Sequence, residues 1–365
     1  MEQNVGVPRG RIAALDELRG LAILAVVASH VGLVFGPELE MARALTVPAF
    51  GVGVDLFFVI SGFVVAENVQ RLRQEADGDF WRGALGFWGR RILRIGLPAW
   101  LVVFLLAAFQ GSGLPLGASD ADLAAAAGFY ANFHWASCFA GETGCGALLA
   151  ASHFWSLASE MQFYLVAPLL MALRPKWTAL ACCAVLVAGT LSARAWGGFW
   201  WTFRADGLAI GVLLSLDAAN QWRLPRMGVA LASFWLLIAS ILAKILAALA
   251  SGFALTAISI IFGFVVASAI QSERRLEKPS VLQKVGELSF SIYLVHLPIL
   301  TVVHENLDWR GFAGVELAIS IVAILLCALL LERAITRPAQ ILGRRFSAWI
   351  SGYAPHRRRS ARAAT

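Results

Sequence analysis

Apolar runs of about 20 residues recur from one end of the chain to the other, and no other feature constrains its fold as strongly. An α-helix needs about 20 apolar residues to cross the hydrocarbon core of a bilayer. The composition agrees with this, because 59% of the 365 residues are hydrophobic and only 15% are charged. That is too apolar for a water-soluble domain of this length. We therefore expect an all-α, polytopic membrane protein.

The apolar runs predict about ten transmembrane helices. Their expected ranges are residues 15–36, 50–69, 92–110, 153–173, 176–193, 199–217, 226–248, 251–270, 285–305 and 312–335. The hydrophilic stretches at 70–91 and 111–152 are too short to hold a core of their own. We assign residues 1–340 to one membrane-embedded domain and residues 341–365 to a basic cytoplasmic tail.

The basic residues predict the orientation. With the N-terminus inside, most arginines and lysines, including those of the tail HRRRSAR, lie on the cytoplasmic side. Only Arg43, Arg194 and Arg310 then fall in outer connections. The positive-inside rule therefore favours an N-in, C-in topology, which agrees with an even number of spans. Topology and anionic membrane lipids account for the net charge of +7, so we expect no nucleic-acid partner.

Two of the five cysteines, Cys138 and Cys145, bracket the short segment CFAGETGC in the expected outer stretch. An oxidising compartment would permit a disulfide between them, and a pair of reduced thiols is the alternative. The other three cysteines lie within apolar runs and are interpreted as small apolar fillers. No spacing of cysteine and histidine resembles a zinc site, so we expect no metal.

Arg19 and His30 are ionisable residues within the first apolar run. Their eleven-residue step covers about 16 Å and about three turns of an α-helix, so both side chains point to nearly the same side. Ionisable side chains in a membrane are costly and usually face a polar interior. This pair is therefore the first candidate for function.

Glu160 lies in the fourth expected span at a depth, counted from the outer end, that matches the depth of His30. A histidine beside a carboxylate and shielded from water can remove a hydroxyl proton near neutral pH. We predict that His30 and Glu160 are catalytic. The alternatives are a hydrogen-bonding role for His30 and an ion pair of Glu160 with Arg204 or Arg194.

Arg90, Arg91 and Arg94 cluster at the expected inner end of the third span, and Arg19 lies slightly deeper on the first. The planar fork of donors in arginine suits phosphate groups. We predict that these four arginines bind a polyphosphate ligand such as acyl-CoA that enters from the cytoplasm. The alternative is that the positive-inside rule alone explains them.

Other polar residues within the runs are candidates for substrate binding. Arg204 and Asp206 are two positions apart and cannot share a helix face, so each is expected to pair with a different neighbour. Arg204 is still a candidate to line the cavity. Tyr293 and His296 share a face, which suits either substrate binding or an interhelical hydrogen-bond pair.

Several segments together resemble the acyltransferase-3 family of bacterial membrane O-acyltransferases. The resemblance lies in LDELRGLAILAVVASH, DLFFVISGFVV, RRILRI, FWSLASEMQFYLVAP, RADGLAIG, GELSFSIYLVHLP and LERAITRPA, which occur in the order of the family and cover nearly the whole chain. Pro98 stands one position later after the arginines than the family's motif leads us to expect.

This resemblance implies about ten helices in the bacterial cytoplasmic (inner) membrane. It also implies transfer of an acyl group from a cytoplasmic thioester to a hydroxyl, often on a sugar at the outer face. His30 would then be the base, Arg19 would belong to the donor channel, Arg91 and Arg94 would match the arginine motif, and Glu160 would be the acid of the WSLxxE motif.

We predict from these observations an acyltransferase that moves a short acyl group, most simply acetyl, from acyl-CoA. The acceptor is a hydroxyl of a glycan, a lipid-linked sugar or another small molecule. Two rival hypotheses stay open at this point. One is a membrane carrier or exporter of acylated sugars or lipids, and the other is a scaffold whose polar pairs are structural.

Overall fold

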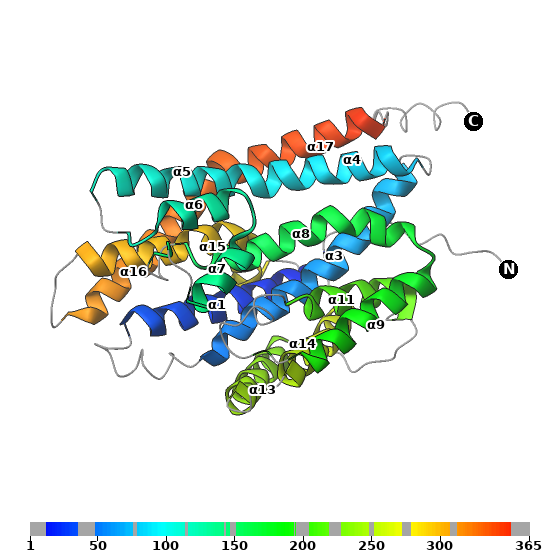
Figure 1. Cartoon of the computed structure of the whole chain (residues 1–365), viewed down its shortest axis with the longest axis horizontal. Helices are drawn as coiled ribbons and strands as arrows, with labels where there is room; N and C mark the ends of the chain where they lie inside the picture. Colours follow the sequence, from blue (N-terminus) through cyan, green and yellow to red (C-terminus); the bar gives the residue numbers. More distant parts are fainter. Residues whose placement is uncertain are drawn as a thin grey trace.

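The computed structural model describes twelve stretches of the chain. These are residues 12–35, 48–75, 79–113, 116–141, 144–146, 151–192, 194, 204–218, 228–247, 252–271, 279–306 and 312–351. The regular elements in them are helical, and most run along the long axis of the molecule (Figure 1). This confirms the all-α prediction for the part of the chain that is described.

The helices follow one another along the chain with these bounds: α1 (Ala13–Phe35), α3 (Gly53–Glu75), α4 (Phe80–Arg91), α5 (Leu97–Gly111), α6 (Asp120–Ala127), α7 (Ala131–Phe139), α8 (Phe154–Ala172), α9 (Pro175–Leu191), α11 (Asp206–Leu213), α13 (Val229–Ala247), α14 (Gly252–Gln271), α15 (Val281–Asn306), α16 (Ala313–Leu331) and α17 (Arg337–Ser351). A 3-10 helix, η1 (Pro48–Val52), precedes α3, and three π turns are η2 (Ile92–Gly96), η3 (Leu214–Ala218) and η4 (Glu332–Thr336).

Each of the ten expected ranges contains a helix, and five helices among the described residues are long and apolar enough to cross a membrane. These five are Phe50–Leu72, Phe80–Gly111, Phe253–Gln271, Val281–Asn306 and Ala313–Ile350. They correspond to the expected spans at 50–69, 92–110, 251–270, 285–305 and 312–335. The structure therefore supports a multi-pass membrane protein, whereas the count of ten spans and the N-in, C-in orientation stay predictions.

Two of the long helices contain a π turn. The turn η2 joins α4 to α5 without a break, since Ile92 and Leu97 both have right-handed helical dihedral angles. A π turn holds one residue more than an α turn and often occurs at functional sites. Pro98 lies in the first turn of α5, which directly follows this π turn. Much of the hydrophilic stretch at 70–91 is therefore part of a long helix.

The other such helix is formed by α16 and α17, which the π turn η4 joins. Its second part, α17, packs along α4 (Figure 1). The expected boundary between domain and tail, at residues 340 and 341, falls inside α17. The described part of the expected tail, up to Ser351, is thus helical and attached to the bundle. The remaining residues, 352–365, lie outside the described part.

Helices α1 and α15 make the most extensive contact in the bundle. A Cβ atom added to Gly286 would lie 1.7 Å from the carbonyl oxygen of Asp16 and 3.0 Å from the amide nitrogen of Gly20. Only a residue without a side chain permits this approach. The contact fixes the parallel register of the two helices, and ten residues further along each of them lie His30 and His296.

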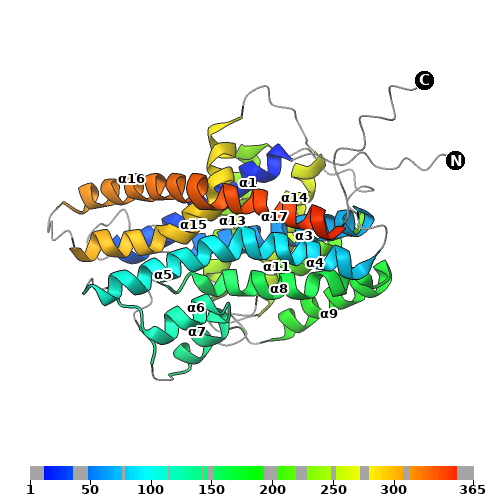
Figure 2. The same cartoon turned by 90° about the horizontal axis from the view of Figure 1, so that it is seen from above.

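The short helices α6 and α7 pack against α5 and α8, on one side of the bundle (Figure 2). The carboxylate of Asp122 holds this segment together, because it accepts hydrogen bonds from Ser119 N (2.7 Å), Gly146 N (3.0 Å) and His134 Nε2 (2.6 Å). Beside it, Cys138 and Cys145 form a disulfide with their Cα atoms 5.8 Å apart. The bridged alternative is therefore the one found in the structure.

Replacing both bridged cysteines with alanine should lower the free energy of unfolding by about 2–3 kcal/mol, because the bridge limits the entropy of the unfolded loop. Thermal unfolding in detergent measures the effect. A reducing agent should lower the Tm of the wild type and leave the Tm of the double variant unchanged. Equal Tm values for both proteins without reductant would contradict the prediction.

Candidate active site

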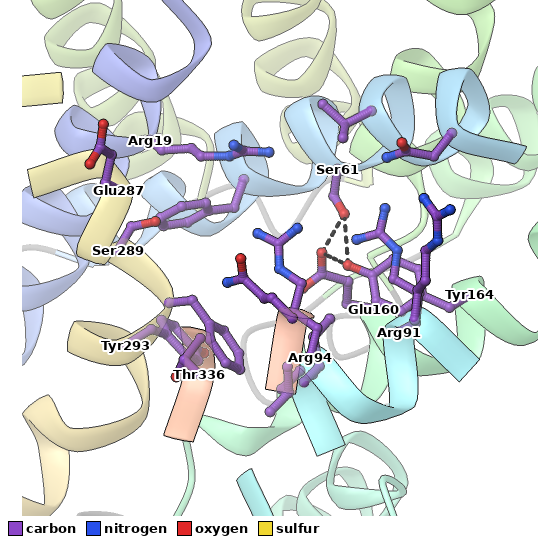
Figure 3. Close-up of a pocket in the computed structure, with 18 of the residues that line it drawn as sticks. Arg19, Ser61, Arg91, Arg94, Glu160, Tyr164, Glu287, Ser289, Tyr293 and Thr336 are labelled. Atoms are coloured by element: carbon purple, nitrogen blue, oxygen red, sulfur yellow. Dashed lines mark hydrogen bonds between the residues drawn. The ribbon is translucent and has the colours of Figure 1, made fainter. Parts of the chain in front are cut away.

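A pocket of about 670 Å³ lies between α1, α3, α4, α8, α15 and α17 (Figure 3). Helix α3 lines it from Val54 to Leu72, with side chains at helical spacing on one face. Eighteen residues of α-helix extend about 27 Å, so the pocket is elongated along α3. Phe57 and Phe58, toward the Val54 end, and Val64 are apolar parts of this wall.

The four predicted donor-binding arginines all line this pocket. Arg19 reaches into it from α1 (Figure 3). Its Nη1 atom forms an ion pair with Asp16 Oδ1, 3.1 Å away. Arg90, Arg91 and Arg94 enter from α4 and its π turn. The structure therefore brings together arginines separated by some 70 residues in the sequence, which is the arrangement that an anionic ligand requires.

Glu160 lines the same pocket and accepts short hydrogen bonds from the hydroxyls of Ser61 and Tyr164 (Figure 3). The two hydroxyl oxygens are 3.1 Å apart. The guanidinium of Arg91 lies over the ring of Tyr164, 4.7 Å from its centroid, a distance typical of a cation–π contact. Glu160 therefore lies among the arginines of the pocket, and its Oε1 atom accepts both hydrogen bonds.

At its other end the pocket reaches Ser156 and Tyr293. The hydroxyl of Tyr293 donates to the carbonyl oxygen of His153 at 2.5 Å, so its oxygen accepts from the hydroxyl of Ser156, also at 2.5 Å. These contacts link α8 to α15. Together, Ser156 and Tyr293 form the wall between the pocket and the histidines beyond it.

His30 and His296 face each other behind this wall, with His30 Nδ1 and His296 Nε2 3.2 Å apart. His296 Nδ1 donates to the carbonyl oxygen of Tyr293 at 2.7 Å, which leaves Nε2 as its acceptor. His30 Nδ1 therefore carries the hydrogen, which is shared with the carbonyl oxygen of Val26 at 2.9 Å. The lone pair of His30 is then on Nε2, since both hydrogen bonds of the ring to described residues go through Nδ1.

The predicted pairing of His30 with Glu160 is wrong. Among the described residues, the hydrogen bonds of His30 go to Val26 and His296, and those of Glu160 go to Ser61 and Tyr164. Ser156 and Tyr293 are in contact. Glu160 lies one turn of α8 from Ser156, and His296 lies one turn of α15 from Tyr293, so Glu160 and the histidine pair are roughly 10 Å apart along the bundle. Equal depth along two helices therefore did not bring the two side chains together.

Arg204 is not among the residues that line the pocket, which corrects its prediction as a substrate-binding residue. It is buried, and its Nη1 atom lies 3.2 Å from Oδ2 of Asp55 on α3. Asp206 pairs instead with Arg194, with Nη1 and Oδ2 2.6 Å apart. The expectation that Arg204 and Asp206 have different partners is confirmed. We reassign Arg204 to the packing of α11 against α3.

Close packing at Gly62 explains this arrangement. A Cβ atom there would lie 2.2 Å from the carbonyl oxygen of Leu208, so α3 and α11 touch through their backbones. The same close approach places Asp55, two turns before Gly62, opposite Arg204 at the start of α11. Arg194, counted as an outer-loop cation in the sequence, is likewise buried in its ion pair.

Several pocket residues were missed by the sequence analysis. Ser156 and Tyr164 stand four positions before and after Glu160, so the helical period itself indicated that they share its face. Ser61 was not among the candidates either. Arg337, Gln340 and Arg344 were missed because they follow the last expected span, 312–335, and Arg344 was assigned to the tail.

Comparison with known proteins identifies the family. The acyltransferase domain of the acyltransferase-3 family matches residues 12–333. The chain belongs to this family. It therefore carries the acyltransferase domain of this family, and the residues that line the pocket from α1 to α15 lie within the matched part.

Two relatives show how far the likeness extends. The acyltransferase MdmB of Streptomyces mycarofaciens is 26% identical over 385 aligned residues, which cover 92% of this chain and 93% of the relative. The peptidoglycan O-acetyltransferase OatA of Listeria monocytogenes is 26% identical over 180 residues, or 48% of this chain and 27% of the relative. The match thus spans about a quarter of the Listeria protein. No solved structure matches the chain.

Proposed function

We propose that this acyltransferase moves a short acyl group, most simply acetyl, from cytoplasmic acyl-CoA to a hydroxyl of a glycan, a lipid-linked sugar or another small molecule. The bacterial cytoplasmic membrane is its proposed location, with both chain ends inside. The observation that carries the proposal is the elongated pocket, which is lined by arginines and is only one layer of side chains away from the His30–His296 pair.

The donor occupies the pocket. Arg19, Arg91 and Arg94 contact its phosphates, since arginine forms bidentate, charge-assisted hydrogen bonds to phosphate oxygens. Its slender pantetheine arm then lies along the apolar wall of α3 toward Ser156 and Tyr293. Glu160 keeps Ser61 and Tyr164 in place, and Tyr164 in turn supports Arg91. Glu160 thereby becomes a positioning residue of the donor site.

His30 is the general base, and His296 orients it. With its Nδ1–H held by Val26 and His296, His30 presents the lone pair of Nε2 to the acceptor hydroxyl. When it takes the proton, the neutral Nε2 of His296 accepts a hydrogen bond from the imidazolium and stabilises it. His296 performs for His30 the role that the sequence analysis gave to Glu160.

The reaction balances without a further reactant. The acceptor oxygen forms an ester bond to the acyl carbon, and the bond between that carbon and sulfur breaks. The hydroxyl proton passes to His30 and from there to the departing thiolate. Before this step the acyl end of the donor passes the hydrogen-bonded Ser156–Tyr293 pair, which lies between the pocket and His30.

An acyl-transfer assay separates this proposal from the carrier hypothesis. Purified protein in vesicles is given acetyl-CoA labelled in the acetyl group together with a hydroxyl-bearing acceptor. A transferase releases free CoA thiol and labels the acceptor, whereas a carrier moves solute without cleaving the thioester. Thiol release that needs the acceptor supports the proposal, and transport without thiol release contradicts it.

Replacing Arg91 with glutamine should raise the KM for acetyl-CoA by about tenfold or more, because a charged hydrogen bond to phosphate and the contact with Tyr164 are both lost. Steady-state kinetics at varied donor concentration checks this. Arg82 is a matched control, since it is exposed, pairs with Asp79 and does not line the pocket. If the two variants have the same KM, Arg91 does not bind the donor.

A further inference from the structure

We propose that one face of α17 binds the nucleotide end of the donor, with Arg344 as the phosphate-binding residue at the entrance of the pocket. The inference rests on the proposed function, because it concerns the same pocket. It adds a part of the site that the family's matched residues, 12–333, do not contain. It also gives a binding role to Arg344, which the sequence analysis assigned to a cytoplasmic tail.

The position of this face is fixed by packing. Arg337, Gln340 and Arg344 follow one another at spacings of three and four residues, share one side of α17 and all line the pocket. The helix is held against α4 at Gly89, where an added Cβ atom would lie 2.1 Å from the ring of Phe346. The pocket-lining side of α17 is therefore part of the folded bundle.

Charge is the second observation. Arg19 has Asp16 as an ion-pair partner, and the Nε atom of Arg337 lies 3.4 Å from Glu332 Oε1. Arg344 differs from both, because the contact of its guanidinium in the described part of the chain is with the backbone carbonyl oxygen of Gln340, at 3.4 Å. Its side chain is exposed at the pocket, so its charge is available to an anionic ligand.

The shape of the pocket determines which part of the donor Arg344 meets. The ring of Phe58 packs against Trp155, 6.2 Å between centroids, so Ser156 lies near the Phe58 end of α3. The start of α17 lies near Tyr293, because Thr336 Oγ1 is 3.4 Å from the Oγ atom of Ser291, two residues before Tyr293. Arg344 follows eight residues later, about 12 Å further along the helix, and so lies away from Ser156. An extended thioester with its acyl end near Ser156 therefore has its phosphates near Arg344.

Two donors that differ only in the nucleotide test this assignment. Acetyl-CoA carries the phosphorylated nucleotide, and S-acetylpantetheine ends where the nucleotide begins. Replacing Arg344 with glutamine should raise the KM for acetyl-CoA about tenfold and leave the KM for S-acetylpantetheine unchanged. Arg344→Lys, which keeps the charge, should recover part of the loss.

The matched control is Arg345→Gln, because Arg345 is the next residue of α17, is also exposed and does not line the pocket. It should leave the KM unchanged for both donors. Adenosine 3′,5′-bisphosphate should compete with acetyl-CoA in the wild type and about tenfold more weakly in Arg344→Gln.

The outcomes separate the two proposals. If the wild type transfers acetyl from acetyl-CoA and Arg344→Gln has the wild-type KM, the α17 inference is overturned while the proposed function stands. If both donors lose affinity equally in Arg344→Gln, the residue does not contact the nucleotide. If the wild type cleaves neither donor, the proposed function itself fails.

Discussion

Replacing His30 with glutamine should lower kcat by about 10²–10⁴-fold, the usual contribution of a general base. Glutamine is polar and similar in size, so the contacts with Val26 and His296 are disturbed little, but its amide cannot accept a proton at neutral pH. The KM for acetyl-CoA should stay close to that of the wild type, since the donor pocket is formed by other residues. Acetyl transfer measured at saturating donor gives the loss in kcat.

Two other histidines of α15 test this assignment, one as a control and one as the partner of His30. His304 lies further along α15 and pairs with Glu316, 3.7 Å away, so His304→Gln should keep its turnover. His296→Leu should lower kcat without changing the donor KM, because it removes the acceptor that orients His30. Comparable Tm values for these variants exclude unfolding as the cause. A fully active His30→Gln protein would show that another group removes the proton.

The second large effect is expected in stability. Replacing Arg204 with methionine leaves the carboxylate of Asp55 buried without the cation that faces it, and breaking a buried ion pair in this way costs about 3–5 kcal/mol. Both side chains are almost fully buried, so water cannot take the place of the missing partner. Unfolding in a mixed detergent series should show this loss of free energy.

A double replacement distinguishes an ion pair from simple packing. Arg204→Met combined with Asp55→Leu removes both charges, and apolar replacements of a buried pair are often nearly neutral. The double variant should therefore recover most of the lost stability and should keep the donor KM, since neither charged group binds the donor. If the double variant is as unstable as Arg204→Met, the role of Arg204 lies in its shape and its contact with Trp155, 5.4 Å from the ring centroid.

For the histidines, the sequence indicated the candidate base but not its partner. His30 was found because a titratable group in an apolar run is costly and therefore rare. Its partner was predicted incorrectly, because matched depth in two helices does not show that they are neighbours. In the structure the partner is His296, on a helix that runs parallel to α1 in a register set by Gly20 and Gly286.

The arginines show the opposite case. Arg90, Arg91 and Arg94 are neighbours on one helix, so their clustering follows from local geometry alone, and the structure places all three in the pocket. Arg344 belongs to the same pocket but lies some 250 residues later in the chain. Its role depends on the packing of α17 against α4, which no local pattern predicts.

By itself, the sequence determined that the chain is helical and has apolar segments suited to a membrane. It also indicated the ionisable residues within those segments as candidates for function. These properties depend on the period of the α-helix and on the cost of burying polar groups, and both act over a few residues. The tertiary structure decided which helices touch, and so which charges share a pocket, an ion pair or a hydrogen bond. Only the tertiary structure could show these pairings, because close backbone contacts at glycines, between segments far apart in the sequence, set the register of neighbouring helices.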